Sequence, residues 1–234
     1  TGLKLITDFT EKNITIKKLA KLKSNGGSCN IGVIDTLGRV WMWSFNTAVS
    51  GLSNLKTSKY TPICISEISD ENPIAPLNEV VINDLLISES FAIAVDSKGE
   101  LWMWGSSGVI VGQLTNGLKP YPTKVDSSYF GNAKIKEIAG SMGCSNMGVA
   151  TASTAIVIDE NGKVWTWGDN SYGELGNGTK TASTIPVCIS DDKNDVLYGV
   201  EMKQIEVSCG THVVGLDTNG TIWAWGGNST YGQA

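Results

Sequence analysis

The segment Val157-Ile-Asp-Glu-Asn-Gly-Lys-Val-Trp-Thr-Trp167 decides the fold, because its pattern occurs four times in the chain. Each copy has an Asp, a Gly three positions later, and two Trp separated by one residue. All eight Trp of the 234 residues belong to these copies. The repeated positions are Asp35, Gly38, Trp41 and Trp43; Asp96, Gly99, Trp102 and Trp104; Asp159, Gly162, Trp165 and Trp167; and Asp217, Gly220, Trp223 and Trp225. The chain is therefore a repeat protein.

The residue types around each Asp predict a β-hairpin. Asp at the first position of a turn bonds its own backbone two residues on, and Gly at the fourth position adopts a positive φ. Strand-forming residues precede the turn, as in Phe91–Val95, and follow it, as in Leu101–Trp104. Both Trp of a pair point to one face of the second strand, and apolar residues point to the other. A strand that is apolar on both faces lies between two layers.

The spacing of the copies predicts a β-propeller. The Asp recurs after 61, 63 and 58 residues, which is the length of a module of several strands. Further strands are expected before each hairpin, at 14–20, 79–83, 134–139 and 203–208. A Pro follows each of the first three Trp pairs and suits an outer strand (Pro62, Pro122, Pro186). The prediction is an all-β propeller of about four four-stranded blades, with repeats near 14–66, 79–126, 134–190 and 203–234.

Copies three and four also carry a family resemblance. Ile156–Gly178 resembles the repeat of the regulator of chromosome condensation superfamily, and Cys209–Leu216, which contains His212, resembles that family's Gly-x-x-His segment. Copy one departs from that pattern, since Ser44 replaces the Gly that follows the second Trp. The resemblance implies a propeller that usually has seven blades. Four units then favour a larger parent chain or assembly, a homo-oligomer included; the alternative is that residues 1–9 complete the last blade.

Charge and residue inventory exclude several function classes. The net charge is −5 and Arg39 is the only Arg, which argues against a nucleic-acid surface. No apolar run is long enough to insert into a membrane. The five Cys form no C-x-x-C pair, so neither a zinc site nor a disulfide framework is expected, and Cys64 and Cys188 are interpreted as small buried residues.

Candidate catalytic groups are few. His212 is the only His, so a catalytic pair of a nucleophile and a His could form only there. The favoured interpretation is that His212 is hydrogen-bonded inside its blade. The Asp-x-x-Gly turns lack the alternating oxygen ligands and distal Glu of a calcium loop. We therefore expect no enzyme activity, no cofactor and no metal.

A rigid propeller without a catalytic centre leaves recognition by loops as the expected function. The copies differ most at 45–60, 66–78 and 141–153, and candidate contact residues in or beside these loops are Asn46, Leu52, Tyr60, Asn72, Met142 and Met147. The expected partner is a protein or cell-surface ligand. The Lys- and Asn-rich, Arg-poor composition favours a bacterium or its phage, with an extracellular, cell-surface or virion location. The family resemblance implies an alternative, guanine-nucleotide exchange on a small GTPase.

Overall fold

The computed structural model describes residues 6–23, 30–44, 49, 59–70, 72–107, 110, 114–142, 153–207 and 211–227. Strands dominate these residues, beside one helical turn, α1 (Asp8–Glu11), and one 3-10 turn, η3 (Ser127–Phe130). No helix among the described residues has the length and hydrophobicity needed to cross a membrane. The all-β prediction is confirmed.

The strands form four sheets in chain order, and each sheet corresponds to one sequence repeat. We call these sheets blades 1 to 4 and number their strands from the inner to the outer edge. Blade 1 contains β1 (Ile16–Leu19), β3 (Asn30–Asp35), β4 (Val40–Ser44) and β5 (Lys59–Cys64). Blade 2 contains β6 (Ile82–Ser88), β7 (Phe91–Asp96), β8 (Leu101–Gly105) and β9 (Lys119–Lys124). Blade 3 contains β10 (Ile135–Met142), β11 (Ser153–Asp159), β12 (Val164–Gly168) and β13 (Ser183–Cys188). Blade 4 contains β14 (Met202–Val207), β15 (His212–Asp217) and β16 (Ile222–Gly226).

Neighbouring strands within each blade are antiparallel, and the Pro residues lie where the sequence places them. Pro62, Pro122 and Pro186 belong to β5, β9 and β13, the outer strands of their blades. Pro lacks the N–H that an inner ladder requires, so an edge strand accommodates it. Among the described residues blade 4 has three strands, because its sheet ends at β16.

Two inner strands differ from the prediction. β6 begins at Ile82 rather than at Glu79, because Glu79 has a φ of 62° and lies in a turn. The predicted strand at 14–20 ends at Leu19, and the chain then forms β2 (Lys21–Lys23), which pairs in parallel with β6 of blade 2. The sequence pattern does not reveal this change of pairing partner, because it depends on how blades 1 and 2 lie against each other.

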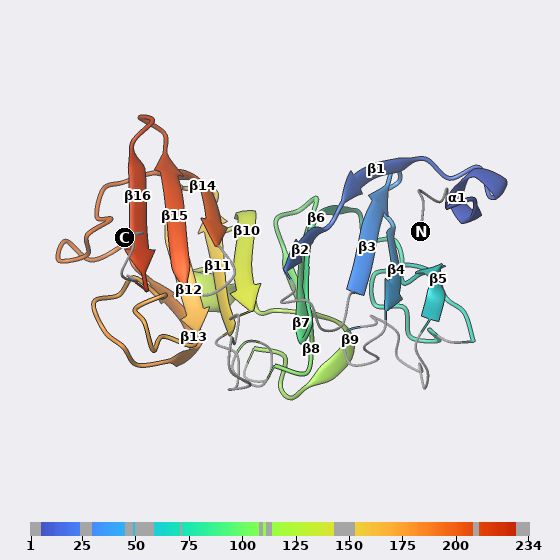
Figure 1. Cartoon of the computed structure of the whole chain (residues 1–234), viewed down its shortest axis with the longest axis horizontal. Helices are drawn as coiled ribbons and strands as arrows, with labels where there is room; N and C mark the ends of the chain where they lie inside the picture. Colours follow the sequence, from blue (N-terminus) through green and yellow to red (C-terminus); the bar gives the residue numbers. More distant parts are fainter. Residues whose placement is uncertain are drawn as a thin grey trace, which may run out of the picture.

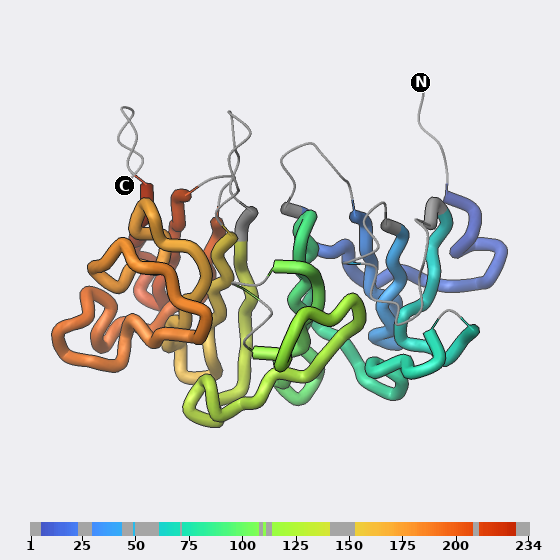
Figure 2. Tube along the Cα trace, turned by 90° about the horizontal axis from the view of Figure 1, so that it is seen from below, coloured from blue at the N-terminus to red at the C-terminus, as the bar shows by residue number. Residues whose placement is uncertain are grey.

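The blades follow one another across the molecule, as Figures 1 and 2 show, with β10 next to β6 and β2 in the middle. The sheet face that carries the Trp pair, here called the Trp face, packs on the preceding blade. Trp104 joins the core of blade 1, Trp167 joins that of blade 2, and Trp225 packs on that of blade 3. The prediction that these strands lie between two layers is confirmed for β8 and β12, each of which is covered by a blade on both faces.

Candidate functional site

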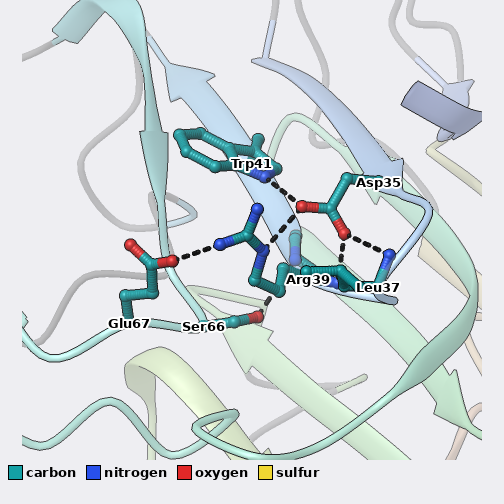
Figure 3. Close-up of polar contacts among 7 residues, drawn as sticks. Asp35, Leu37, Arg39, Trp41, Ser66 and Glu67 are labelled. Carbon is teal, nitrogen blue, oxygen red and sulfur yellow. Dashed lines mark hydrogen bonds and ion pairs between the residues drawn. The ribbon is translucent and has the colours of Figure 1, made fainter. Parts of the chain in front are cut away.

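The turn of blade 1 shows how the repeated Asp is used (Figure 3). One oxygen of Asp35, Oδ1, accepts the backbone N–H groups of Leu37 at 2.9 Å and Arg39 at 3.0 Å. The other oxygen, Oδ2, accepts the indole N–H of Trp41 at 3.0 Å. Gly38 closes the turn with a φ of 80°. The carboxylate therefore links the turn to the first Trp of the pair.

The other three copies repeat this geometry. Asp96, Asp159 and Asp217 each accept two backbone N–H groups of their own turn through Oδ1, at 2.8–3.0 Å. Their Oδ2 atoms accept the indole N–H of Trp102, Trp165 and Trp223 at 3.1, 3.0 and 3.1 Å. The bond between the Asp and the first Trp was not predicted from the sequence. The constant spacing of six residues between them could have indicated it.

Two of the turn carboxylates are held in their charged form by these bonds. Burial raises the pKa of Asp35, but bonds from Trp41 and from the backbone and side chain of Arg39 outweigh it, so its pKa lies below the ordinary value. The bond from the indole of Trp223 is the main cause that lowers the pKa of Asp217. With the same bonds in all four copies, the repeat carboxylates serve the turns, as acceptors of structural bonds.

Arg39 is likewise used inside the fold. Its Nε donates to Asp35 at 2.7 Å, its Nη1 donates to Glu67 at 2.5 Å, and its guanidinium lies 5.5 Å from the centre of the Trp41 ring. Figure 3 shows this chain of contacts from Glu67, which follows β5, across to the turn. The guanidinium thereby links the segment after the outer strand to the turn of blade 1.

The structure brings no catalytic constellation together among the residues it describes. His212 begins β15 opposite Gly226 and is half-buried. Burial is the largest cause that raises the pKa of the Cys64 thiol, to about 12, so this thiol stays protonated and weakly nucleophilic at neutral pH. Within the described ranges, no group of three or more His, Cys, Asp or Glu side chains is placed to hold a metal ion.

The second Trp of the pair in blades 2, 3 and 4 joins its blade to the preceding one. Trp104 donates its indole N–H to the carbonyl of Val49 at 3.1 Å, and Trp167 donates to that of Ile110 at 3.1 Å. Trp225 donates to the carbonyl of Glu174 at 2.9 Å. Each acceptor lies between the third and fourth strands of the preceding blade. We call this contact the indole bond of a junction.

The Glu174 side chain is fully buried, and one of its oxygens is not satisfied. Oε2 accepts the N–H of Tyr172 at 2.8 Å, whereas Oε1 has no hydrogen-bond partner among the described atoms. We expect Glu174→Gln to raise the free energy of unfolding by about 1 kcal/mol, because it removes a buried charge and keeps the oxygen that accepts from Tyr172. Urea denaturation followed by circular dichroism measures the change.

The matched control for that substitution is Glu201→Gln, at an exposed residue before β14, which should leave stability within about 0.5 kcal/mol of the parent. A loss of stability in Glu174→Gln would contradict the interpretation, since it would mean that a donor depends on Oε1.

Charged side chains line the inner edge between blades 2 and 3. A cavity of about 420 Å³ there is bordered by Lys18, Asp84, Lys134, Lys136 and Glu137, among others. Lys21 of β2 donates to Glu137 at 2.6 Å and to the Ile138 carbonyl at 2.9 Å, and lies 3.1 Å from Asp84.

Asp84 also pairs with Lys18 at 2.6 Å. Burial lowers the pKa of Lys21, but the bond to Glu137 and the charge of Asp84 outweigh it, so the pKa lies above its ordinary value. The network balances its own charges and ties blades 1, 2 and 3 together.

The candidate contact residues fall into three groups. Asn46, Leu52 and Met147 lie outside the described residues. Tyr60 belongs to β5, and Met142 ends β10. Asn72 is fully buried and donates its amide N–H to the carbonyl of Ile65 at 2.8 Å, so this side chain supports its loop from within. A contact role at 66–78 therefore stays a prediction for the exposed residues of that loop.

Exposed apolar side chains lie on two connections that lead from an outer strand to the next inner strand. These segments, 65–81 and 189–201, are here called the outer connections. Ile68 and Ile74 are 67% and 59% exposed on the first, and Val196 and Tyr198 are 78% and 56% exposed on the second. Both segments approach the Asp turns, since the Ile82 and Met202 amides that follow them donate to Gly38 and Gly162. They place apolar groups at one end of the blades.

Comparisons with known proteins agree with this architecture. Residues 161–216 match the model of the regulator of chromosome condensation (RCC1) repeat. The human E3 ubiquitin-protein ligase HERC2 is 28% identical over 141 residues, which cover 58% of this chain and 2% of HERC2. The ultraviolet-B receptor UVR8 of Arabidopsis thaliana is 26% identical over 172 residues, covering 72% of this chain and 34% of the receptor.

A solved structure extends the likeness to almost the whole chain. The Prp20p structure from Saccharomyces cerevisiae superposes with a TM-score of 0.65 at 20% identity, covering 97% of this chain and 47% of Prp20p. The chain thus spans less than half the length of this structure and of the two relatives. The shared repeat, the order of strands within the blades and these likenesses identify the chain as a β-propeller of RCC1-type repeats.

Proposed function

We propose that this chain is a protein-binding scaffold that recognises its partner with the outer connections. The exposed side chains of Ile68, Ile74, Val196 and Tyr198 carry this proposal. Each connection carries two exposed apolar side chains close together in sequence, and loops on a rigid frame commonly carry recognition. The RCC1-type propeller architecture also supports a binding or scaffold role.

The use of the polar groups supports binding over chemistry. The turn carboxylates accept bonds from their own turns and from Trp, and Arg39 is held by Asp35 and Glu67. These groups are committed to the fold. What the outer connections offer to a partner is therefore shape and apolar area.

The finer proposal is a cell-surface or receptor-binding role in a bacterium or phage. Composition supports it: the chain holds a single Arg among its 18 basic residues and has a net charge of −5. A protein or a cell-surface ligand is the class of partner.

The test compares surface binding by three purified chains. Labelled parent chain is titrated onto intact bacterial cells, together with the double variant Ile68→Asp/Val196→Asp and the control Leu37→Asp, whose site is also exposed but lies on a turn. We expect the double variant to bind about tenfold more weakly and the control to bind like the parent. Equal binding of all three chains would refute a role for the outer connections.

The likeness to Prp20p supports testing nucleotide exchange as the second candidate. Prp20p itself binds Gsp1p and histones. Release of a fluorescent guanine nucleotide from purified Gsp1p is measured with and without this chain. A scaffold without exchange activity leaves the release rate unchanged, whereas acceleration would favour the second candidate.

A further inference from the structure

The part of the chain that the structure describes holds four Asn-Gly dipeptides, here called the Asn-Gly pairs. They are Asn116-Gly117, Asn161-Gly162, Asn177-Gly178 and Asn219-Gly220. Asn is a thermolabile residue type. Before a Gly it is most reactive, because the backbone nitrogen of Gly reaches the side-chain carbon of Asn without a side chain of its own in the way. The surroundings of each pair decide whether the two atoms can meet.

The reaction of an Asn-Gly pair needs only water. The Gly nitrogen loses its proton and bonds to Cγ of the Asn, and the amide nitrogen leaves as ammonia, so that a five-membered succinimide forms. Water then opens the ring at one of its two carbonyls. Opening at one carbonyl leaves Asp, whereas opening at the other leaves an isoaspartyl residue, whose main chain is one methylene longer. Both products carry a carboxylate in place of the neutral amide.

The repeated Asp turn restrains two of the four pairs. In blade 3 the N–H of Asn161 donates to Oδ1 of Asp159 at 2.9 Å, and the N–H of Gly162 donates to the Asp159 carbonyl at 3.0 Å. The turn of blade 4 holds Asn219 and its Gly by the same two bonds, at 2.8 and 3.2 Å. The attacking nitrogen is therefore bound to an acceptor, and the turn must open before the ring can form.

The third pair is restrained through the Asn side chain. Oδ1 of Asn177 accepts the N–H of Thr179 at 3.1 Å and its hydroxyl at 2.8 Å. The same oxygen accepts Nδ2 of Asn170, a residue that is 1% exposed, at 3.2 Å. This amide must give up three hydrogen bonds before it can rotate towards the nitrogen that follows it.

The fourth pair lacks both kinds of restraint. Asn116 and Gly117 are exposed in the connection from β8 to β9, and Leu118 beside them is 52% exposed. Within the described ranges, neither the Asn116 side chain nor the N–H of Gly117 makes a hydrogen bond. Nothing lies within 4 Å of a Cβ built on Gly117, and the same holds for Gly178 and Gly220. Hydrogen bonds, and not space, distinguish this pair from the others.

We propose that Asn116 is the site at which the folded chain deamidates first among the four Asn-Gly pairs, through a succinimide formed with Gly117. The chain then gains one negative charge at the connection from β8 to β9. Exposed loops without internal bonds are where covalent damage of folded proteins concentrates. The Asp turns have the opposite effect, since their bonds hold the Asn-Gly pairs of blades 3 and 4 in an unreactive geometry.

The connection that contains Asn116 also supports the junction of blades 2 and 3. Ile110 is fully buried in the core that these blades share, and its carbonyl accepts the indole N–H of Trp167 at 3.1 Å. The hydroxyl of Thr115, a residue that is 5% exposed, donates to the carbonyl of Gly117 at 2.7 Å. An isoaspartyl residue at position 116 lengthens the main chain between these last two residues. It should therefore break their bond and weaken the junction, whereas the Asp product leaves the main chain unchanged.

The test follows each Asn-Gly pair by mass spectrometry during incubation of the folded chain at mildly alkaline pH. Digestion with pepsin at acidic pH limits further reaction. Deamidation at Asn116 should be at least about tenfold faster than at Asn161, Asn177 and Asn219, because those three must first break the bonds of their turns. In concentrated urea the four rates should agree within about threefold, because the turns are lost. Equal rates in the folded chain, or a faster reaction at one of the other three, would overturn the proposal.

Hydroxylamine provides a second readout, since it attacks the succinimide and cuts the chain after residue 116. Asn116→Gln should abolish this cut, and a cut that persists at this position would contradict the assigned site. The aged chain, enriched in the isoaspartyl form, should melt about 2–4 °C below the parent. The matched control Asn116→Asp carries the same added charge on an unchanged main chain and should melt within about 1 °C of the parent. Equal melting of the aged chain and Asn116→Asp would refute the effect on the junction.

Discussion

Trp167→Ala is expected to lower the free energy of unfolding by about 4 kcal/mol. Trp167 is fully buried and packs in the core that blades 2 and 3 share, with Phe130 at 6.0 Å. Truncation removes most of the side-chain volume from this core. It also leaves the carbonyl of Ile110 without the indole N–H that it accepts at 3.1 Å. The loss comes mainly from the cavity and partly from this unsatisfied acceptor.

Urea denaturation followed by far-ultraviolet circular dichroism measures this change, since the signal does not depend on the Trp that is replaced. Trp167→Phe retains an aromatic ring and should cost less, about 2 kcal/mol. A third variant, Tyr172→Ala, removes an aromatic ring that is 58% exposed and should cost under about 1 kcal/mol. If Trp167→Ala were no more damaging than Tyr172→Ala, the Trp face would not be the main contact between blades.

Asp159→Ala should be the next most damaging change, with a loss of about 3 kcal/mol. Asp159 is 1% exposed and accepts three bonds: from the backbone N–H groups of Asn161 at 2.9 Å and Lys163 at 3.0 Å, and from the Trp165 indole at 3.0 Å. Alanine leaves these donors without their acceptor. The turn loses its internal support, and the Trp165 ring loses its anchor.

Asp159→Asn separates the two functions of this carboxylate. The amide oxygen still accepts the backbone bonds, but the amide nitrogen faces the indole N–H of Trp165, so an intermediate loss of about 2 kcal/mol is expected. Asp191→Ala provides the control, because its carboxylate is 61% exposed and pairs with Lys163 at the surface, a contact worth under about 1 kcal/mol. Thermal melts should rank the variants Asp159→Ala, Asp159→Asn and Asp191→Ala from least to most stable.

The repeat could be predicted from the sequence because its turn depends on the chemistry of neighbouring residues. The Asp turn with a Gly at positive φ was predictable, because both features depend on residues within four positions of each other. The outer strands were predictable from Pro62, Pro122 and Pro186. The bond that the Trp41 indole N–H donates to Asp35 was not predicted although its spacing is constant, because a carboxylate in a turn already has backbone partners.

Other features depended on neighbours distant in sequence. Glu79 belongs to a strand-forming run, yet the turn that leads into β6 holds it at a φ of 62°. Asn72 belongs to a variable loop, yet the Ile65 carbonyl holds its amide inside. The candidate contacts Asn46, Leu52 and Met147 lie beyond the described residues and stay predictions.

The sequence by itself determined the repeat, its turns, the burial of β8 and β12 on both faces and the propeller class, because these follow from spacing and from the chemistry of nearby residues. The tertiary structure alone decided which face meets which blade: Trp104 reaches Val49, β2 leaves its own sheet for β6, and Lys21 crosses to Glu137. Such contacts join residues some 55 to 116 positions apart. Their geometry depends on how whole sheets stack, and the spacing of residues along the chain does not determine that stacking.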